Sequence, residues 1–497
     1  MRKEQLPLAR RKQDTGPPRK IQMRSLNEQQ DYFLIIPRKQ NREIVVTYDS
    51  ERRALGPCSL PKITIPRWER KGIGLTRKIQ KELSLNSICL FWLRSPRAIN
   101  ADDLHLINPP RTAVLEIRTS EWIPPHGMKW MSVESLESED FADEVHFEFL
   151  QTALKQAEDY ASGRKVGPFG RPGWLDEVFA WARPYLKPYG LDFTGGFQQH
   201  NASANFNLVR LETNGPSVWL KGANDENWPE YNITVGLATR LPKYFPKLYA
   251  HRPDWHAWLN EGLDSSLYGA LHAPQLEGTV RTLASLQTEL AGDTKFLFSI
   301  RCKDWRMHRI AEQIGPFIDS MTELMEKQET VPPSKLSRQE LRDLASILEN
   351  ACGRLAALGI PDTFVHGDFT PGSNVVASDR CLLIDLAEAY VGHPFLCFQY
   401  LLDGLHTRFS QFDTFHDHLR SVYASYWRKF VSPETIGEAF RLSRLVTVLW
   451  HATGGNGWQG RRGYLDLIRE KYYRSLVRQM HSRARELQGQ GVACAAS

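Results

Sequence analysis

The strongest chemical signal in the chain is a pair of aspartates, each of which follows a short apolar run. Asp368 follows residues 363–367 and begins a turn rich in proline and glycine, which exposes a carboxylate. Asp385 follows a second apolar run, and Asn374 lies between the two aspartates. Carboxylate and amide oxygens are the ligands that Mg²⁺ prefers beside phosphates. A carboxylate free of the metal could take a proton from a hydroxyl nucleophile. Together these groups predict phosphoryl transfer.

The alternative interpretation is that each aspartate only caps a strand end or a turn, which is ordinary for either residue alone. The combined spacing, with the asparagine between the two, favours the chemical interpretation. Glu388 follows closely and is either a helper of the metal or acceptor, or a solvated turn charge.

The segment His366-Gly367-Asp368, with Asn374 and Ile384-Asp385 after it, resembles the signature of the aminoglycoside phosphotransferase and choline kinase-like enzymes. These are small-molecule relatives of protein kinases, and the resemblance covers roughly residues 195–480. It implies that Asp368 is the catalytic base and that His366 braces the loop. It also implies ATP and Mg²⁺ as cofactors and a small-molecule hydroxyl as acceptor.

The same resemblance assigns further residues upstream. Lys221 ends an apolar strand, matches the phosphate-contacting lysine and needs a partner, for which Glu230 at the start of the next helix is suitable. The alternative is a surface lysine and a glutamate favoured by a helix N-terminus. The hinge that faces the adenine would include Asn260, Glu261 and Gly262.

Three departures from the family pattern matter. Asn374 lies six residues after Asp368 where the family has five, so the metal ligands are Asp385 with either Asn374 or Ser373. The loop expected to cover the phosphates near 197–206 contains no glycine, and Ser203 and Asn205 would cover them instead. Cys397 replaces an aspartate that is common in the family, and we expect it to support the loop rather than react.

These motifs require elements that position them. Runs rich in β-branched and aromatic residues predict strands, and apolar residues at helical spacing predict helices, mostly beyond residue 274. The expected fold class is α+β: a two-lobed protein-kinase-like fold with a small antiparallel sheet lobe and a larger helical lobe, preceded by a small α/β domain. The expected parts are a disordered basic arm (1–25), the α/β domain (26–163), a linker and docking helix (164–194), the N-lobe (195–270), the helical C-lobe (271–482) and a flexible tail (483–497).

The N-terminal α/β unit carries a weaker resemblance. Residues 77–85, which follow Glu69, loosely resemble the helix of a Nudix hydrolase box, but Lys78 and Lys81 stand where that box has metal-binding glutamates. An ordinary amphipathic helix is the alternative and the favoured interpretation. A degenerate unit of this kind would serve packing or partner binding.

Charge and cysteine content bound the remaining possibilities. Residues 1–24 hold eight lysines and arginines against two carboxylates, which equals the net charge of +6 of all 497 residues. The basic character therefore belongs to a short arm, and we do not expect nucleic acid as a partner. Seven scattered cysteines without a CxxC pair indicate reduced thiols, and no apolar run is long enough to span a membrane. We expect a cytoplasmic protein; its oligomeric state is not readable.

Two other functional hypotheses stay open. A catalytically impaired, pseudokinase-like binding or regulatory protein would keep the fold without turnover, as the inserted residue and the glycine-free loop suggest. Nucleic-acid binding through the basic arm would be strongly dependent on salt and would vanish with residues 1–24.

Overall fold

The structure is a computed structural model, and it describes most of the chain outside the basic arm. The described residues are 29–38, 40–48, 57–66, 69, 71–94, 110–119, 121–203, 205–224, 227–263, 273–329, 331–370, 374–377, 380–408, 414–454 and 464–495. The predicted disordered arm at 1–25 lies outside them.

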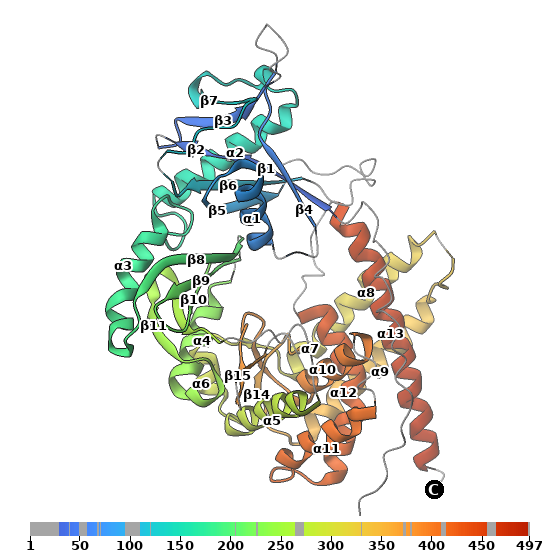
Figure 1. Cartoon of the computed structure of the whole chain (residues 1–497). Coiled ribbons are helices and arrows are strands. Elements are labelled where there is room, and N and C mark those ends of the chain that lie inside the picture. The colour runs from blue at the N-terminus through green and yellow to red at the C-terminus, as the bar shows by residue number, and fades with distance from the viewer. Residues whose placement is uncertain are drawn as a thin grey trace, which may run out of the picture.

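The described part of the N-terminal unit contains two small sheets and the helices α1 and α2 (Figure 1). One sheet has the order β4-β1-β6-β5, with β1 parallel to β6 and the other pairs antiparallel. The other has the order β2-β3-β7. Their bounds are β1 Gln29–Ile35, β2 Pro37–Arg38, β3 Glu43–Thr47, β4 Lys62–Pro66, β5 Ser87–Arg94, β6 Arg111–Ile117 and β7 Met128–Ser132; the helices are α1 Lys71–Leu83 and α2 Glu144–Ala161.

Helix α3 (Trp174–Leu186) connects this unit to the next sheet. Trp174, Trp181 and Tyr185 lie at helical spacing, which predicts a single buried face. Trp174 is fully buried, but Trp181 is only partly buried and Tyr185 is exposed. The buried face instead includes Ala182 and Leu186, so the helix docks along its whole length.

The sheet that follows α3 is antiparallel, with the order β11-β12-β10-β9-β8. Alternation puts Leu220 and Val209 on the face covered by α3 and the N-terminal unit, and Lys221 on the opposite face. Helix α4 leaves after β10 and leads to β11. The bounds are β8 Phe193–Ala202, β9 Phe206–Thr213, β10 Val218–Ala223, α4 Pro229–Arg240, β11 Leu248–Arg252 and β12 Ala257–Glu261.

The rest of the described chain is mainly helical, with short strands around the aspartates. The helices are α5 Ala273–Glu289, α6 Thr294–Ser299, α7 Met307–Ala311, α8 Ile314–Glu326, α9 Arg338–Ala357, α10 Pro394–Arg408, α11 His416–Trp427, α12 Pro433–Gly454 and α13 Tyr464–Ala495. The strands are β13 Lys303–Asp304, β14 Thr363–Val365, β15 Asn374–Ala377, β16 Arg380–Leu383 and β17 Tyr390–Gly392.

Two sequence expectations in this lobe were wrong. The apolar spacing of residues 305–325 predicts a single helix, but α7 ends at Ala311 and α8 starts at Ile314. A flexible tail was expected from 483, but α13 continues to Ala495. Arg483 donates two hydrogen bonds to Asp403, at 2.9 and 3.0 Å, and this contact holds the helix against the lobe.

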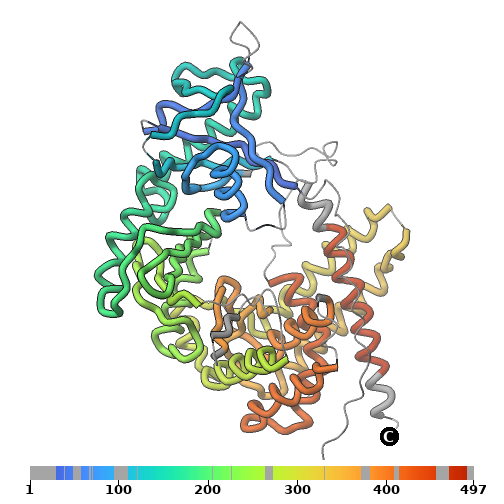
Figure 2. Tube along the Cα trace, in the orientation of Figure 1, coloured from blue at the N-terminus to red at the C-terminus, as the bar shows by residue number. Residues whose placement is uncertain are grey.

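The cores follow the two-lobed arrangement that the sequence predicts, and the α+β fold class is confirmed. One large cluster fills the helical lobe, and a second spans the N-terminal unit, α3 and the outer face of the β8–β12 sheet. Figure 2 shows the order from blue through green to red, with the green sheet between the N-terminal unit and the helices. Across the described ranges, no helix has both the length and the apolar character needed to cross a membrane.

The buried histidine at the start of α10 should make stability depend on pH. Burial lowers the pKa of His393 from 6.5 to about 3. Between these values the unfolded chain binds more protons, so this contribution is full above pH 6.5 and is lost as the pH falls toward 3. Replacing His393 with Gln should flatten the pH dependence of the unfolding free energy by up to about 1.4 kcal/mol per pH unit. Urea unfolding at a series of pH values measures this slope. The same change at exposed His126 is the control, and an unchanged slope in His393→Gln would contradict this account.

Candidate active site

The site begins with Lys221 in the middle of the β8–β12 sheet. Its Nζ lies 2.5 Å from Glu230 Oε1 in the first turn of α4. The Glu230 side chain is 1% exposed, and Asn227 Nδ2 donates to its other oxygen at 2.8 Å. The ammonium also lies 4.6 Å from the centre of the Phe206 ring. The predicted Lys221 and Glu230 pair is therefore a contact of the folded protein.

The same ammonium reaches across to the helical lobe. Lys221 Nζ donates to Asp385 Oδ1 at 2.9 Å, from a residue 164 positions earlier. Asp385 follows β16 and has a φ of +63°, a left-handed conformation that aspartate tolerates better than most residues. Its side chain is 56% exposed, so a carboxylate oxygen faces solvent beside the ammonium.

Lys221, Glu230 and Asp385 form a triad of charged side chains whose charges stabilise one another. Burial opposes the charge of Lys221, but the carboxylates of Glu230 and Asp385 outweigh it and raise the lysine pKa. The ammonium in turn lowers the pKa of Asp385 against the effect of burial. Lys221 and Asp385 are thus ionised at neutral pH. Lys221 is then a cation, and Asp385 carries the negative charge that a metal ligand needs.

Asp368 lies in the turn after β14, and the backbone there is tightly constrained. Gly367 has a φ of +83°, and a Cβ on it would lie 2.0 Å from the carbonyl oxygen of Glu388. The fully buried ring of His366 donates from Nε2 to the carbonyl of Ile384 at 2.9 Å. This contact ties the Asp368 turn to the residue before Asp385, so His366 acts as the expected brace.

Two further groups adjoin the Asp368 turn. Burial raises the pKa of Glu388, and the charges of Asp368 and Asp385 raise it further. Glu388 is an exposed residue in a turn, and the charges of both aspartates act on its carboxyl, so its role stays open. Burial also raises the pKa of the Cys397 thiol to about 12, and the backbone amides of His366 and Gly367 contact it. The thiol supports the loop in its neutral form.

The hairpin between β8 and β9 lies where the phosphate-covering loop was expected. Ser203 Oγ accepts a hydrogen bond from Asn201 Nδ2 at 2.9 Å and one from the backbone of Asn205 at 3.3 Å. Asn224 Nδ2, at the end of β10, donates to the carbonyl of Ser203 at 2.7 Å. Side-chain hydrogen bonds therefore shape this turn, whose sequence contains no glycine.

The expected hinge residues end strand β12. Asn260 pairs with Trp219 of β10, whose neighbour on the same face is Lys221. The side-chain oxygen of Asn260 is buried without a hydrogen-bond partner among the described residues. Glu261 Oε1 accepts from the backbone of Lys247 at 2.8 Å. A Cβ on Gly262 would lie 2.1 Å from the carbonyl oxygen of Ser217, so only glycine fits beside β10.

The predicted metal ligands lie on one hairpin. Asn374 begins β15 and pairs with Leu383, two residues before Asp385, so both occupy the same end of the hairpin. Ser373 and the side chain of Asn374 lie outside the described residues. Within the described part, no group of three or more histidine, cysteine or acidic side chains is arranged to hold a metal ion. The carboxylate oxygens of Asp385 suit Mg²⁺, and a second ligand would have to come from the start of β15.

Several neighbours of these groups could not be inferred from the sequence. Tyr400 Oη on α10 donates to Asp368 Oδ1 at 3.2 Å. Its ring lies 5.4 Å from that of His451, which hydrogen-bonds the phenol of Tyr472 at 2.5 Å. These residues come from three helices, so only the folded chain brings them to Asp368. Asn227, by contrast, could have been suspected from its place three residues before Glu230.

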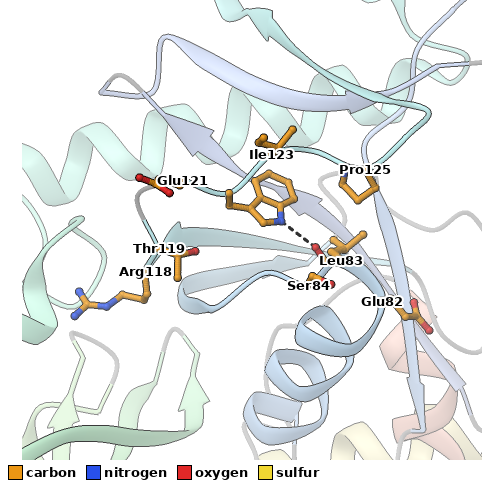
Figure 3. Close-up of a pocket in the computed structure, with 9 residues that line it drawn as sticks. Glu82, Leu83, Ser84, Arg118, Thr119, Glu121, Ile123 and Pro125 are labelled. Carbon is orange, nitrogen blue, oxygen red and sulfur yellow. Dashed lines mark hydrogen bonds between the residues drawn. The ribbon is translucent and has the colours of Figure 1, made fainter.

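A separate hollow lies in the N-terminal unit between the end of α1 and the segment after β6 (Figure 3). Trp122 Nε1 donates to the carbonyl of Leu83 at 2.9 Å, and Ile123 is 82% exposed. Arg118, which also lines the hollow, donates a hydrogen bond from Nη2 to Asp176 of α3 at 2.9 Å. None of the predicted site residues lines this hollow. Nearby, Lys78 pairs with Glu82 at 2.9 Å, so a glutamate of the Nudix-like helix faces a cation.

Comparison with known proteins gives fold matches alone. No protein-family model and no curated protein matches the chain. A choline/ethanolamine kinase family protein from Mesorhizobium loti is 13% identical over 63% of this chain and 94% of that chain, with a TM-score of 0.39. An aminoglycoside phosphotransferase from Alicyclobacillus acidocaldarius is 12% identical over 60% and 93%, with a TM-score of 0.36. A choline kinase from Streptococcus pneumoniae is 16% identical over 55% and 89%, with a TM-score of 0.34. The functional proposal rests on the contacts around Lys221.

The buried Lys221 and Glu230 pair predicts strong coupling between two substitutions. Lys221→Met leaves the Glu230 carboxylate buried and unpaired, which should cost about 3–5 kcal/mol of unfolding free energy. Adding Glu230→Gln removes that charge and should restore most of the loss. Urea unfolding of the two single variants and the double variant measures the coupling. Additive losses would show that the two side chains do not interact.

Proposed function

We propose that this chain transfers the γ-phosphoryl group of ATP to a hydroxyl of a small molecule, with Mg²⁺ as cofactor. The observation that carries the proposal is the Lys221 ammonium held between Glu230 of one lobe and Asp385 of the other. Phosphoryl transfer is mainly a matter of positioning and charge stabilisation, so a fixed cation beside a metal-binding carboxylate is its central requirement.

Lys221 would bind the α- and β-phosphates of the nucleotide. Glu230 fixes the ammonium from behind, because it is buried and is itself held by Asn227. Ser203 and Asn205 at the hairpin tip would cover the phosphates. Asn260, Glu261 and Gly262 would face the adenine, and the unpartnered oxygen of Asn260 is a suitable acceptor for an exocyclic amine.

Asp385 would hold Mg²⁺ together with Asn374 or Ser373. When bound, the ion neutralises the charge that develops on the transferring phosphoryl group. Asp385 is ready for this role because the nearby ammonium keeps it ionised while its side chain stays half exposed.

Asp368 would act as the base. It accepts the proton of the acceptor hydroxyl while the new oxygen–phosphorus bond forms and the bond from the γ-phosphorus to the bridging oxygen breaks, leaving ADP. Tyr400 donates to one oxygen of Asp368, which fixes the carboxylate and leaves its other oxygen for the acceptor. We also propose a cytoplasmic location, which is consistent with the free thiols of Cys58, Cys89, Cys302, Cys352, Cys381 and Cys397.

A pseudokinase-like binding or regulatory role is the second candidate. The Ser203 hydroxyl already accepts hydrogen bonds within its own hairpin, and Asp385 already binds Lys221. Nucleotide binding would have to exchange some of these contacts. Mg²⁺-dependent consumption of ATP by the purified protein separates the two candidates.

Asp368→Asn is the direct test of the proposed chemistry. It keeps the shape and the contact to Tyr400 but removes the base, so kcat should fall about 10²–10⁴-fold while KM for ATP changes little. A screen of small-molecule alcohols for ATP-dependent phosphorylation supplies the acceptor, and Asp403→Asn, which lies on the Arg483 side of α10, is the control. Full activity in Asp368→Asn would refute the assignment of the base.

A further inference from the structure

The N-terminal unit is attached to the hairpin that would cover the nucleotide phosphates. The side chain of Gln199 on β8 is 1% exposed and reaches Cys89 on β5, an edge strand of the N-terminal sheet. Its Oε1 accepts from the backbone N–H of Cys89 at 2.8 Å, and its Nε2 donates to the carbonyl of Cys89 at 2.7 Å. The amide thus satisfies both backbone groups, as a neighbouring strand would.

Helix α1 contacts the same strand, backbone to backbone. A Cβ on Gly72 would lie 2.6 Å from the carbonyl carbon of His200 and 2.7 Å from the carbonyl oxygen of Gln199. Real Cβ atoms do not approach so closely, so glycine is required here. By contrast, the nearest neighbour of a Cβ on Gly74, two residues further along α1, would be the side chain of Glu69.

The last residue of β8 belongs to the N-terminal core. Ala202 is 1% exposed and packs in the cluster that includes Leu75 and Ile79 of α1. Ser203 follows directly and starts the hairpin tip. Between Gln199 and the tip, Asn201 donates to Ser203 Oγ at 2.9 Å and to the carbonyl of Phe206 at 2.8 Å. The anchor and the tip are therefore joined by consecutive, bonded residues.

We propose that the N-terminal unit is a positioning device for the nucleotide, which acts by holding the β8–β9 hairpin through Gln199 and the close approach of Gly72. Residues 197–206 at the tip contain no glycine, so the backbone freedom of a glycine-rich phosphate loop is missing and other contacts must set the shape of the tip. Fixing it before binding removes the entropy cost of ordering it on the nucleotide. The effect on nucleotide binding rests on the proposed function, whereas the attachment of the hairpin to the N-terminal unit does not.

Two pairs of variants test the attachment in the full-length protein. Gln199→Met keeps the packing and removes both hydrogen bonds to Cys89; Trp122→Phe, which removes a hydrogen bond elsewhere in the same unit, is its control. Gly72→Ala forces α1 away from β8, whereas Gly74→Ala makes the same change against a flexible side chain. Hydrogen exchange of the hairpin amides is measured without ligand, and titration with MgATP gives the nucleotide affinity.

Gln199→Met and Gly72→Ala should speed exchange in the hairpin about tenfold and weaken MgATP binding about five- to tenfold, with both controls near wild type. Unchanged hairpin exchange in the two folded variants would overturn the proposal, and so would faster exchange with unchanged MgATP affinity. If the wild type does not bind MgATP, the proposed function fails and with it the nucleotide role of the unit, while the exchange data still report on the attachment.

Discussion

At the site, the ammonium group of Lys221 contacts one carboxylate from each lobe, in addition to the contacts that Arg240 and Tyr244 make with the helical lobe. Taking a charge out of water is expensive, and it is tolerated only where opposite charges and hydrogen bonds surround it. Here Glu230 supplies a buried carboxylate from the sheet lobe, and Asp385 supplies a half-exposed one from the helical lobe. The distance of 2.9 Å between Lys221 and Asp385 defines how the lobes face each other at the site.

Around this triad the backbone is placed by turns rather than by regular elements. Gly367 is forced to be glycine by the carbonyl of Glu388, and Asp385 adopts a left-handed conformation after β16. The hydrogen bond from His366 to Ile384 links these two turns and so helps to fix the position of one aspartate relative to the other. Conformations of this kind cost free energy and persist where the surrounding structure determines them, as at active sites.

Much of the site was predictable from the sequence because its residues lie in short, ordered segments. Lys221 ends its apolar run, Glu230 opens a helix, and each aspartate follows a run of its own, so residue type and local order, together with the family resemblance, pointed to them. The contacts made by Tyr400 and Gln199 were not predictable, since each depends on how distant elements pack. The break between α7 and α8 was missed because apolar spacing continues through it. The long α13 was missed because its contacts with the lobe, and not its own composition, hold its last part.

The most direct test of the central claim is the binding of ATP to wild type and Asp385→Asn, with and without Mg²⁺, by calorimetric titration. If Lys221 and Asp385 form a metal-assisted nucleotide site, Mg²⁺ should tighten ATP binding to wild type by about tenfold or more, and the variant should lose this gain while keeping metal-free affinity. An ATP affinity that ignores Mg²⁺ in both proteins, or no ATP binding at all, would contradict the account.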